Sequence, residues 1–292
     1  MIGGVLAAIV LDFDPYVRLA GWAVRWETLG IAGAVLVGIL ATARIAGRVP
    51  AGDVWIGEDE ASDEEREGPY LRRDDLLFIL LGAVPGAVVL GRAGYGLLHA
   101  DYYAGRWQDL LDPSRGSLEL TLAVVGGTLT AIYVAALLDA PVGRWLHVAI
   151  GPLLLALALG KAAEALGGSG QGASSAAAWA TAYLPPGPWG SPGAEFPAHP
   201  AQLYEAATTA AVLFVVALLA RRTPLRRADG RLYAVGFGLW ALGRAAVAAS
   251  WRDPAVAGPL SAEQALSLAV ATIALGSAVV ATLARRVYAR RT

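Results

Sequence analysis

Long apolar stretches make up most of this chain, and shorter polar segments separate them. A helix needs about 20 residues to cross roughly 30 Å of hydrocarbon. Seven stretches have about that length: residues 27–46, 76–98, 118–138, 145–165, 203–220, 232–249 and 263–284. They are rich in Leu and Ala and lack the period-two alternation of strands or membrane barrels. The pattern therefore predicts an all-α integral membrane protein with about seven transmembrane helices.

The first 12 residues are also apolar but are too short to span a bilayer. We expect them to be re-entrant or interfacial. They have no basic region at their start and no small-residue cleavage site before Asp12, so they do not resemble a cleaved signal peptide.

Composition supports a membrane protein and narrows its chemistry. The chain is 56% hydrophobic and 16% charged, with a mean hydropathy of +0.52. It has no Cys, which excludes disulfides, thiolate metal sites and a cysteine nucleophile of its own. A net charge of −1 argues against nucleic acid as a partner.

The distribution of cations predicts the orientation. Of 23 Lys and Arg, 15 fall on one side of the predicted spans, five on the other side and three inside spans. Because cytoplasmic loops carry the excess of Lys and Arg, the N-terminus should be outside and the C-terminus cytoplasmic.

Two loops stand out in what we expect to be one polytopic domain, residues 1–292. Residues 49–75 are acidic and read as a solvated cytoplasmic loop, whereas residues 167–200 form an external arm rich in Gly, Ser and Pro. The arm should lie on the membrane interface through its aromatic residues. These are Trp179, Tyr183, Trp189 and Phe196.

Two patterns that could indicate a cofactor or a metal do not have the context that such sites need. Residues 168–173 match G-x-G-x-x-A, but they follow an apolar helix and no βαβ unit surrounds them. His99, His147 and His199 fall near different membrane faces, which argues against a three-histidine metal site. We therefore expect no metal and no cofactor.

A polar cluster opens the fifth predicted span, with the sequence H-P-A-Q-L-Y-E at residues 199–205. Pro200 suits the first turn of a helix, and Gln202 and Glu205, three residues apart, share one face. Polar groups at the edge of a bilayer are costly. They either anchor a helix end at the interface or form a site for lipid head groups.

Further charges lie in the outer half of the predicted spans or at their outer surface. Lys161 and Glu164 could simply be a satisfied i,i+3 pair, and Arg92 could extend its charge to the interface. Together, however, the cations suit an anionic head group, because Arg matches phosphate geometry. The charges are Glu27, Arg92, Lys161, Glu164, Arg244 and Arg252.

The polar cluster at residues 199–205 and several other segments resemble a known family, the bacterial prolipoprotein diacylglyceryl transferases. Residues 199–205 resemble that family's H-P-x-Q-L-Y-E motif, and the similarity extends along most of the chain. Further similar segments are Asp14-Pro15 with residues 24–30 (V-R-W-E-T-L-G), residues 91–95 (G-R-A-G-Y), residues 158–172, Arg244 with residues 251–254 (W-R-D-P), and residues 261–267.

Several positions depart from the family pattern. Glu27 stands where the family has Tyr, and residues 116–120 (G-S-L-E-L) replace its H-G-G motif. Lys161 stands where the family's signature has Arg, and Glu164 falls where it has Asn.

The resemblance implies an enzyme of the bacterial inner membrane. It would transfer a diacylglyceryl group from phosphatidylglycerol to the lipobox cysteine of a preprolipoprotein signal peptide, among membrane lipids and without a cofactor. Candidate catalytic residues are His199, Tyr204, Glu205 and Arg244, with Glu119 as a possible base in place of the missing His. Candidate substrate-binding residues are Glu27, Arg92, Tyr95, Glu119, Lys161, Glu164, Gln202 and Arg252. A non-catalytic member that binds lipid or a partner protein is the alternative.

Overall fold

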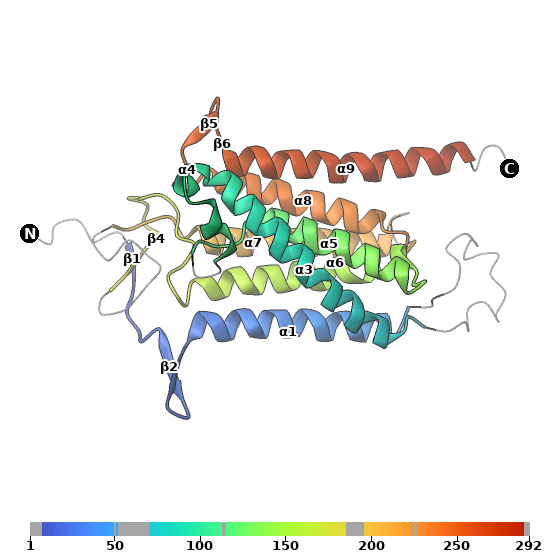
Figure 1. The fold of residues 1–292 in the computed structure, drawn as a ribbon, viewed down its shortest axis with the longest axis horizontal. Helices are drawn as coiled ribbons and strands as arrows, with labels where there is room; N and C mark the ends of the chain where they lie inside the picture. Colours follow the sequence, from blue (N-terminus) through green and yellow to red (C-terminus); the bar gives the residue numbers. More distant parts are fainter. Residues whose placement is uncertain are drawn as a thin grey trace, which may run out of the picture. The chain divides into compact units, whose positions relative to one another are not determined.

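The computed structural model describes residues 8–49, 51, 70–112, 115–184, 196–222, 225 and 227–288 (Figure 1). Most of the predicted acidic loop, residues 49–75, therefore lies outside the described residues, as do residues 185–195 of the predicted arm. Long helices account for most of the rest. They are α1 (Trp26–Ala46), α3 (Arg73–Leu98), α5 (Leu120–Leu137), α6 (Val142–Glu164), α7 (Ala201–Arg222), α8 (Arg231–Ala248) and α9 (Ala262–Tyr288).

Six of these helices are long and apolar enough to cross a membrane: α1, α3, α5, α6, α7 and α9. This confirms a mostly helical, multi-pass membrane protein. The helix α8 coincides with the remaining predicted span at residues 232–249, but it is only 18 residues long and contains Arg231 and Arg244. Two arginines lower its hydropathy, so the count of seven spans stays a prediction.

Short strands appear that the sequence pattern did not predict. The strand β1 (Ala8–Leu11) pairs in parallel with β4 (Ala180–Tyr183), so this part of the N-terminal segment is bound to the arm by backbone hydrogen bonds. Two small hairpins precede α1 and α9. They are β2 (Tyr16–Leu19) with β3 (Trp22–Arg25), and β5 (Ala255–Ala257) with β6 (Leu260–Ser261).

The arm is less superficial than its composition suggested. Every residue of β4 is buried, and the side chain of Tyr183 is 1% exposed, so the expectation that Tyr183 anchors the arm to the membrane surface is wrong. Trp179 and Phe196 remain exposed, as interfacial anchors would be. Trp189 lies outside the described residues.

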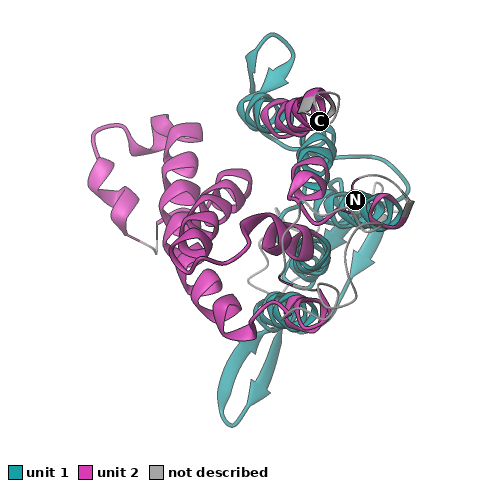
Figure 2. Cartoon of the chain, turned by 90° about the vertical axis from the view of Figure 1, so that its right-hand side faces the viewer, with its two compact units in different colours: residues 1–41, 151–218, 236–271 teal, residues 42–150, 219–235, 272–292 magenta. Residues whose placement is uncertain are grey.

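The chain divides into two compact units, which Figure 2 colours separately. Unit 1 contains residues 1–41, 151–218 and 236–271; unit 2 contains residues 42–150, 219–235 and 272–292. In unit 1, α1 packs closely on α6, where Gly30 faces Ala163 and Gly38 faces Ala156. In unit 2, a buried cluster includes Leu76, Ile79, Ala135, Trp145 and Val148.

Within unit 2, α3 and α5 approach through glycines. A methyl group on Gly126 would collide with the backbone oxygen of Gly86, and the reverse substitution would collide with that of Gly126. Small residues allow helix backbones to come this close in a membrane.

Gly126→Ala should therefore overpack this contact and destabilise the protein by about 1–3 kcal/mol. Thermal unfolding in detergent measures the effect. Gly33→Ala is the matched control, since a methyl group on Gly33 meets nothing within 4 Å. Equal melting temperatures for the two variants would show that the close approach is unimportant.

Candidate functional site

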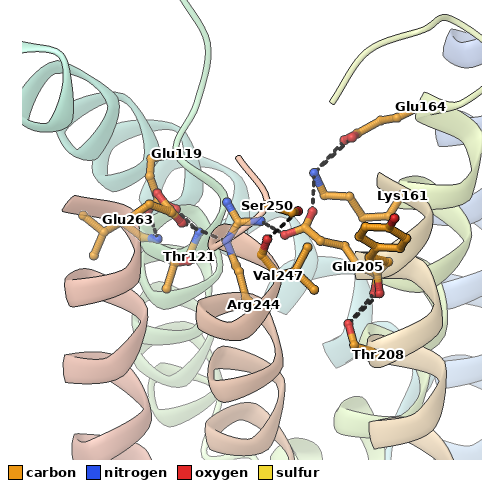
Figure 3. A network of polar contacts seen from close by, with 12 residues as sticks. Glu119, Thr121, Lys161, Glu164, Glu205, Thr208, Arg244, Val247, Ser250 and Glu263 are labelled. Atoms are coloured by element: carbon orange, nitrogen blue, oxygen red, sulfur yellow. Dashed lines mark hydrogen bonds and ion pairs between the residues drawn. The ribbon is translucent and has the colours of Figure 1, made fainter. Parts of the chain in front are cut away.

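Five charged side chains form a continuous chain of ion pairs in unit 1 (Figure 3). Arg244 donates from Nη1 to Glu205 Oε1 at 2.5 Å and from Nε to Glu263 Oε1 at 2.9 Å. The Lys161 Nζ lies 2.8 Å from Glu205 Oε2 and 2.9 Å from Glu164 Oε1. Acids and bases therefore alternate in the order Glu164, Lys161, Glu205, Arg244, Glu263.

The helices α6, α7, α8 and α9 bring these groups together at those of their ends that belong to unit 1. Lys161 and Glu164 lie in the last turn of α6, and Arg244 lies near the end of α8. Glu263 lies in the first turn of α9, where the helix dipole favours a negative charge, and Glu205 follows the first turn of α7. Successive helices run in opposite directions, so the ends of α6 and α8 and the starts of α7 and α9 place all five charged side chains at one end of unit 1.

Burial makes this network costly to disturb. The side chains of Arg244, Glu205 and Glu263 are 6%, 5% and 6% exposed. A buried charge needs a partner, and removing one partner typically costs about 3–5 kcal/mol. The Arg244 guanidinium also lies over the Trp251 ring, 4.8 Å from its centroid, which adds a cation–π contact.

The second polar group of the site joins His199 to Tyr204. The His199 Nδ1 lies 3.3 Å from the Tyr204 hydroxyl, which also accepts a hydrogen bond from Trp179 Nε1 at 2.7 Å. The backbone of His199 pairs with Gly172 and Ala173, which fixes the start of α7 against the arm. Both side chains are half-buried.

Gln202 is 1% exposed, and its amide is oriented by a short chain of hydrogen bonds. Its Nε2 donates to the Tyr183 hydroxyl at 3.4 Å, and that hydroxyl donates to the Ala165 carbonyl at 2.7 Å. Burial raises the pKa of Tyr183 to about 12, so the hydroxyl keeps its proton. Among the described residues, Gln202 Oε1 has no donor, which typically costs about 1–3 kcal/mol.

The glycine-rich stretch of the arm lies close around these side chains. Side chains on Gly167 and Gly172 would collide with Glu27 and with the Ser250 backbone, and one on Gly170 would lie 2.6 Å from Glu164 Oε2. Gly170 also has φ +74°, which favours glycine. The G-x-G-x-x-A string at residues 168–173 is thus part of a loop that follows α6.

Two further predicted residues, Glu27 and Arg252, lie next to this loop. Glu27 is linked to it through Arg25. Arg25 Nη2 lies 3.3 Å from Glu27 Oε2 and donates to the Gly167 carbonyl at 3.0 Å. Arg252 donates from Nε to the Gly172 carbonyl at 2.8 Å. Arg252 is exposed, and no other described residue forms a hydrogen bond or ion pair with it, which leaves its two terminal nitrogens for a ligand.

The remaining predicted residues, Arg92, Tyr95 and Glu119, belong to unit 2. Glu119 caps α5, accepting from the backbone N–H groups of Thr121 and Leu122 at 2.6 and 2.5 Å. The Tyr95 ring stacks on His99. Arg92 donates to five backbone carbonyls in the connecting loop between α3 and α5, part of which forms the short 3-10 helix η1 (Trp107–Leu111). They are those of Asp109, Leu110, Asp112, Arg115 and Ser117.

Comparison with known proteins decides the family. A family model described as prolipoprotein diacylglyceryl transferase matches residues 15–280, most of the chain. The chain belongs to this family. The resemblance drawn from its motifs is confirmed.

Several curated relatives carry the name phosphatidylglycerol–prolipoprotein diacylglyceryl transferase. One from Methylibium petroleiphilum is 34% identical over 60% of this chain and 65% of its own length. One from Beijerinckia indica is 28% identical over 79% of both chains. One from Listeria monocytogenes is 23% identical over 91% of this chain and 89% of its own length.

The structure shows how this chain accommodates its departures from the family pattern. Lys161 and Glu164, in place of Arg and Asn, are bonded to each other as the predicted i,i+3 pair. The pair is also part of a larger network, because Lys161 reaches Glu205 as well. Glu119, where the family's H-G-G motif is missing, serves as a helix cap.

Glu263 is the site residue that motif reasoning missed. It lies in the first turn of α9, is buried and binds Arg244. A carboxylate at the start of an apolar helix was a usable signal, since such a charge needs a partner. Among the described residues, no group of three or more His, Asp or Glu is placed to hold a metal ion.

Proposed function

We propose that this chain transfers a diacylglyceryl group from phosphatidylglycerol to the lipobox cysteine thiol of a preprolipoprotein. The sulfur forms a bond with the glyceryl carbon, the bond from that carbon to the phosphate oxygen breaks, and glycerol phosphate leaves. The buried chain of alternating charges is the observation that carries the proposal, because it holds two cations rigidly at one end of unit 1.

The cations fit the role of stabilising the leaving phosphate. Arg244 and Lys161 are fixed in advance by carboxylates, so little reorganisation is needed when negative charge develops. Arg252, with its exposed guanidinium, would complete the phosphate contacts. Arg92 makes five bonds to loop carbonyls, so we assign it to shaping that loop.

The sequence left open whether Glu205 or His199 accepts the thiol proton and which of them positions the cations. Both oxygens of Glu205 bind cations, so we assign Glu205 to positioning Lys161 and Arg244. His199 is half-buried and outside the ion pairs, and an imidazole can accept a thiol proton near neutral pH. We therefore assign the proton transfer to His199, with Tyr204 orienting its ring.

The finer topology belongs to the same proposal: seven spans including α8, an external N-terminus, a cytoplasmic C-terminus and an inner-membrane location. The excess of Lys and Arg on one side supports it. A Cys introduced at Ser174 should react with an impermeant thiol reagent added outside spheroplasts, and one at Ser62 should react only after lysis. The reverse pattern would contradict the orientation.

Thioether formation tests the activity. Purified protein in micelles that contain phosphatidylglycerol should attach the diacylglyceryl group to a lipobox peptide, and a peptide with Ser in place of Cys is the control. The same chain should restore lipidation of a reporter lipoprotein in cells depleted of their own enzyme. Lipid binding without thioether product or complementation would favour the non-catalytic alternative.

A further inference from the structure

We infer that Gln202 and Glu164 bind the glycerol hydroxyls of the phosphatidylglycerol head group and thereby select the lipid donor. This inference rests on the proposed function. It starts from the buried Gln202 Oε1, which has no donor among the described residues.

The orientation of the Gln202 amide follows from its neighbours. The Tyr183 hydroxyl has one proton and donates it to the Ala165 carbonyl. The hydroxyl can therefore only accept a hydrogen bond from Gln202, so the Gln202 amide donates through Nε2. The amide oxygen is then directed elsewhere as an acceptor. Buried acceptors are rarely left without a donor, so a donor brought by the substrate would fill the place.

Glu164 offers further acceptor capacity beside it. Its side chain is 21% exposed, against 5% for Glu205 and 6% for Glu263, which makes it the most accessible acid of the network. Among the described residues its hydrogen-bonding and ion-pair partner is Lys161. A carboxylate has about four lone-pair sites, so it can accept from a ligand while it holds Lys161.

The side chains of Glu164 and Gln202 both approach Gly170. A methyl group on Gly170 would lie 2.6 Å from Glu164 Oε2 and 3.3 Å from the Gln202 Cβ. Glu164 and Gln202 therefore border the same backbone position, and any side chain there would displace the Glu164 carboxylate. Lys161, a proposed phosphate contact, binds Glu164 directly, so a head group on Lys161 would place its outer end at these acceptors.

The chemistry of the head group fits this arrangement. Beyond its phosphate, phosphatidylglycerol offers two hydroxyl groups, and each can donate one hydrogen bond. A carboxylate and an amide oxygen suit two neighbouring hydroxyls, as acidic residues do for ribose hydroxyls in nucleotide sites. The inference therefore makes Glu164 and Gln202 specificity-determining residues.

Comparison of two lipids tests the inference. Phosphatidylethanol has the same phosphate charge and the same reacting carbon, but its head group lacks hydroxyls. Initial rates of thioether formation should be measured with each lipid as the sole donor. Wild type should prefer phosphatidylglycerol by about 10²-fold or more, because a site built to bind hydroxyls discriminates against analogues that lack them.

Gln202→Leu should lower the rate with phosphatidylglycerol by roughly 10–100-fold and change the rate with phosphatidylethanol by less than about threefold. Gln171→Leu is the matched control. Gln171 is a neighbouring glutamine whose Nε2 binds Thr181, so its loss should leave the ratio of the two rates unchanged.

Equal wild-type rates with both lipids would overturn the inference and leave the proposed function standing, and this comparison needs no folded variant. A preference for phosphatidylethanolamine would also overturn it, by assigning the two acceptors to an ammonium group. Equal losses of the rates with phosphatidylglycerol and with phosphatidylethanol in Gln202→Leu would also overturn the inference. No product from wild type with any lipid would instead overturn the proposed function.

Discussion

Arg244→Ala should cause the largest loss of all single substitutions in this protein. Glu205 and Glu263, both buried, would lose the cation that binds them. We expect transfer to fall by about 10²–10³-fold or more, as for loss of a transition-state hydrogen-bond donor. We also expect destabilisation by about 3–5 kcal/mol, because two buried charges are left short of a partner.

Initial rates and thermal unfolding in detergent measure these effects separately, and binding of phosphatidylglycerol should weaken by well over tenfold. Arg227→Ala is the control, since Arg227 is exposed and carries the same charge. Arg244→Lys would keep the charge but not the forked geometry that holds two carboxylates. Small and equal effects of Arg244→Ala and Arg227→Ala would contradict a central role for Arg244.

Glu205→Gln should have the second largest effect. The substitution keeps the shape of the side chain and removes the negative charge that Lys161 and Arg244 share. Both cations would shift, and misplacement by about 1 Å can cost about 10²-fold in rate. Membrane insertion should be unaffected, because one polar exchange at a helix end barely changes the hydropathy of the span.

The pH profile distinguishes positioning by Glu205 from proton transfer by Glu205. If Glu205 only positions the cations, Glu205→Gln lowers the rate at every pH and keeps the shape of the profile. His199→Ala should change that shape, because it removes the group that accepts the thiol proton in the proposed reaction. Loss of the acidic limb in Glu205→Gln alone would make Glu205 the base. Asp74→Asn, at an exposed acid in the first turn of α3, is the control.

The helices were largely predictable from the sequence. The expected span at residues 27–46 became α1 (Trp26–Ala46), and that at 145–165 became α6 (Val142–Glu164). Long apolar runs specify such helices locally, since the backbone must satisfy its own hydrogen bonds in lipid. The pairing of β1 with β4 was not predictable, because it joins residues 8–11 to 180–183 and each strand is too short to show a period.

The site was predictable in its members but not in its contacts. Lys161, Glu205 and Arg244 follow from the cost of charges near a membrane, whereas their bonds to one another depend on how three helix ends meet. Arg92 looked like a phosphate ligand, but it binds backbone carbonyls. Any loop has carbonyls, so no sequence pattern could indicate these partners.

The parallel pairing of β1 with β4 has a practical consequence for producing this protein. Tyr183, which orients Gln202, is the last residue of β4 and pairs with Leu11. Trimming, fusing or tagging the chain close to residues 8–11 would therefore act directly on a strand that supports the site. Affinity tags are better placed beyond α9, and a tag at the other end needs a spacer long enough to leave β1 undisturbed.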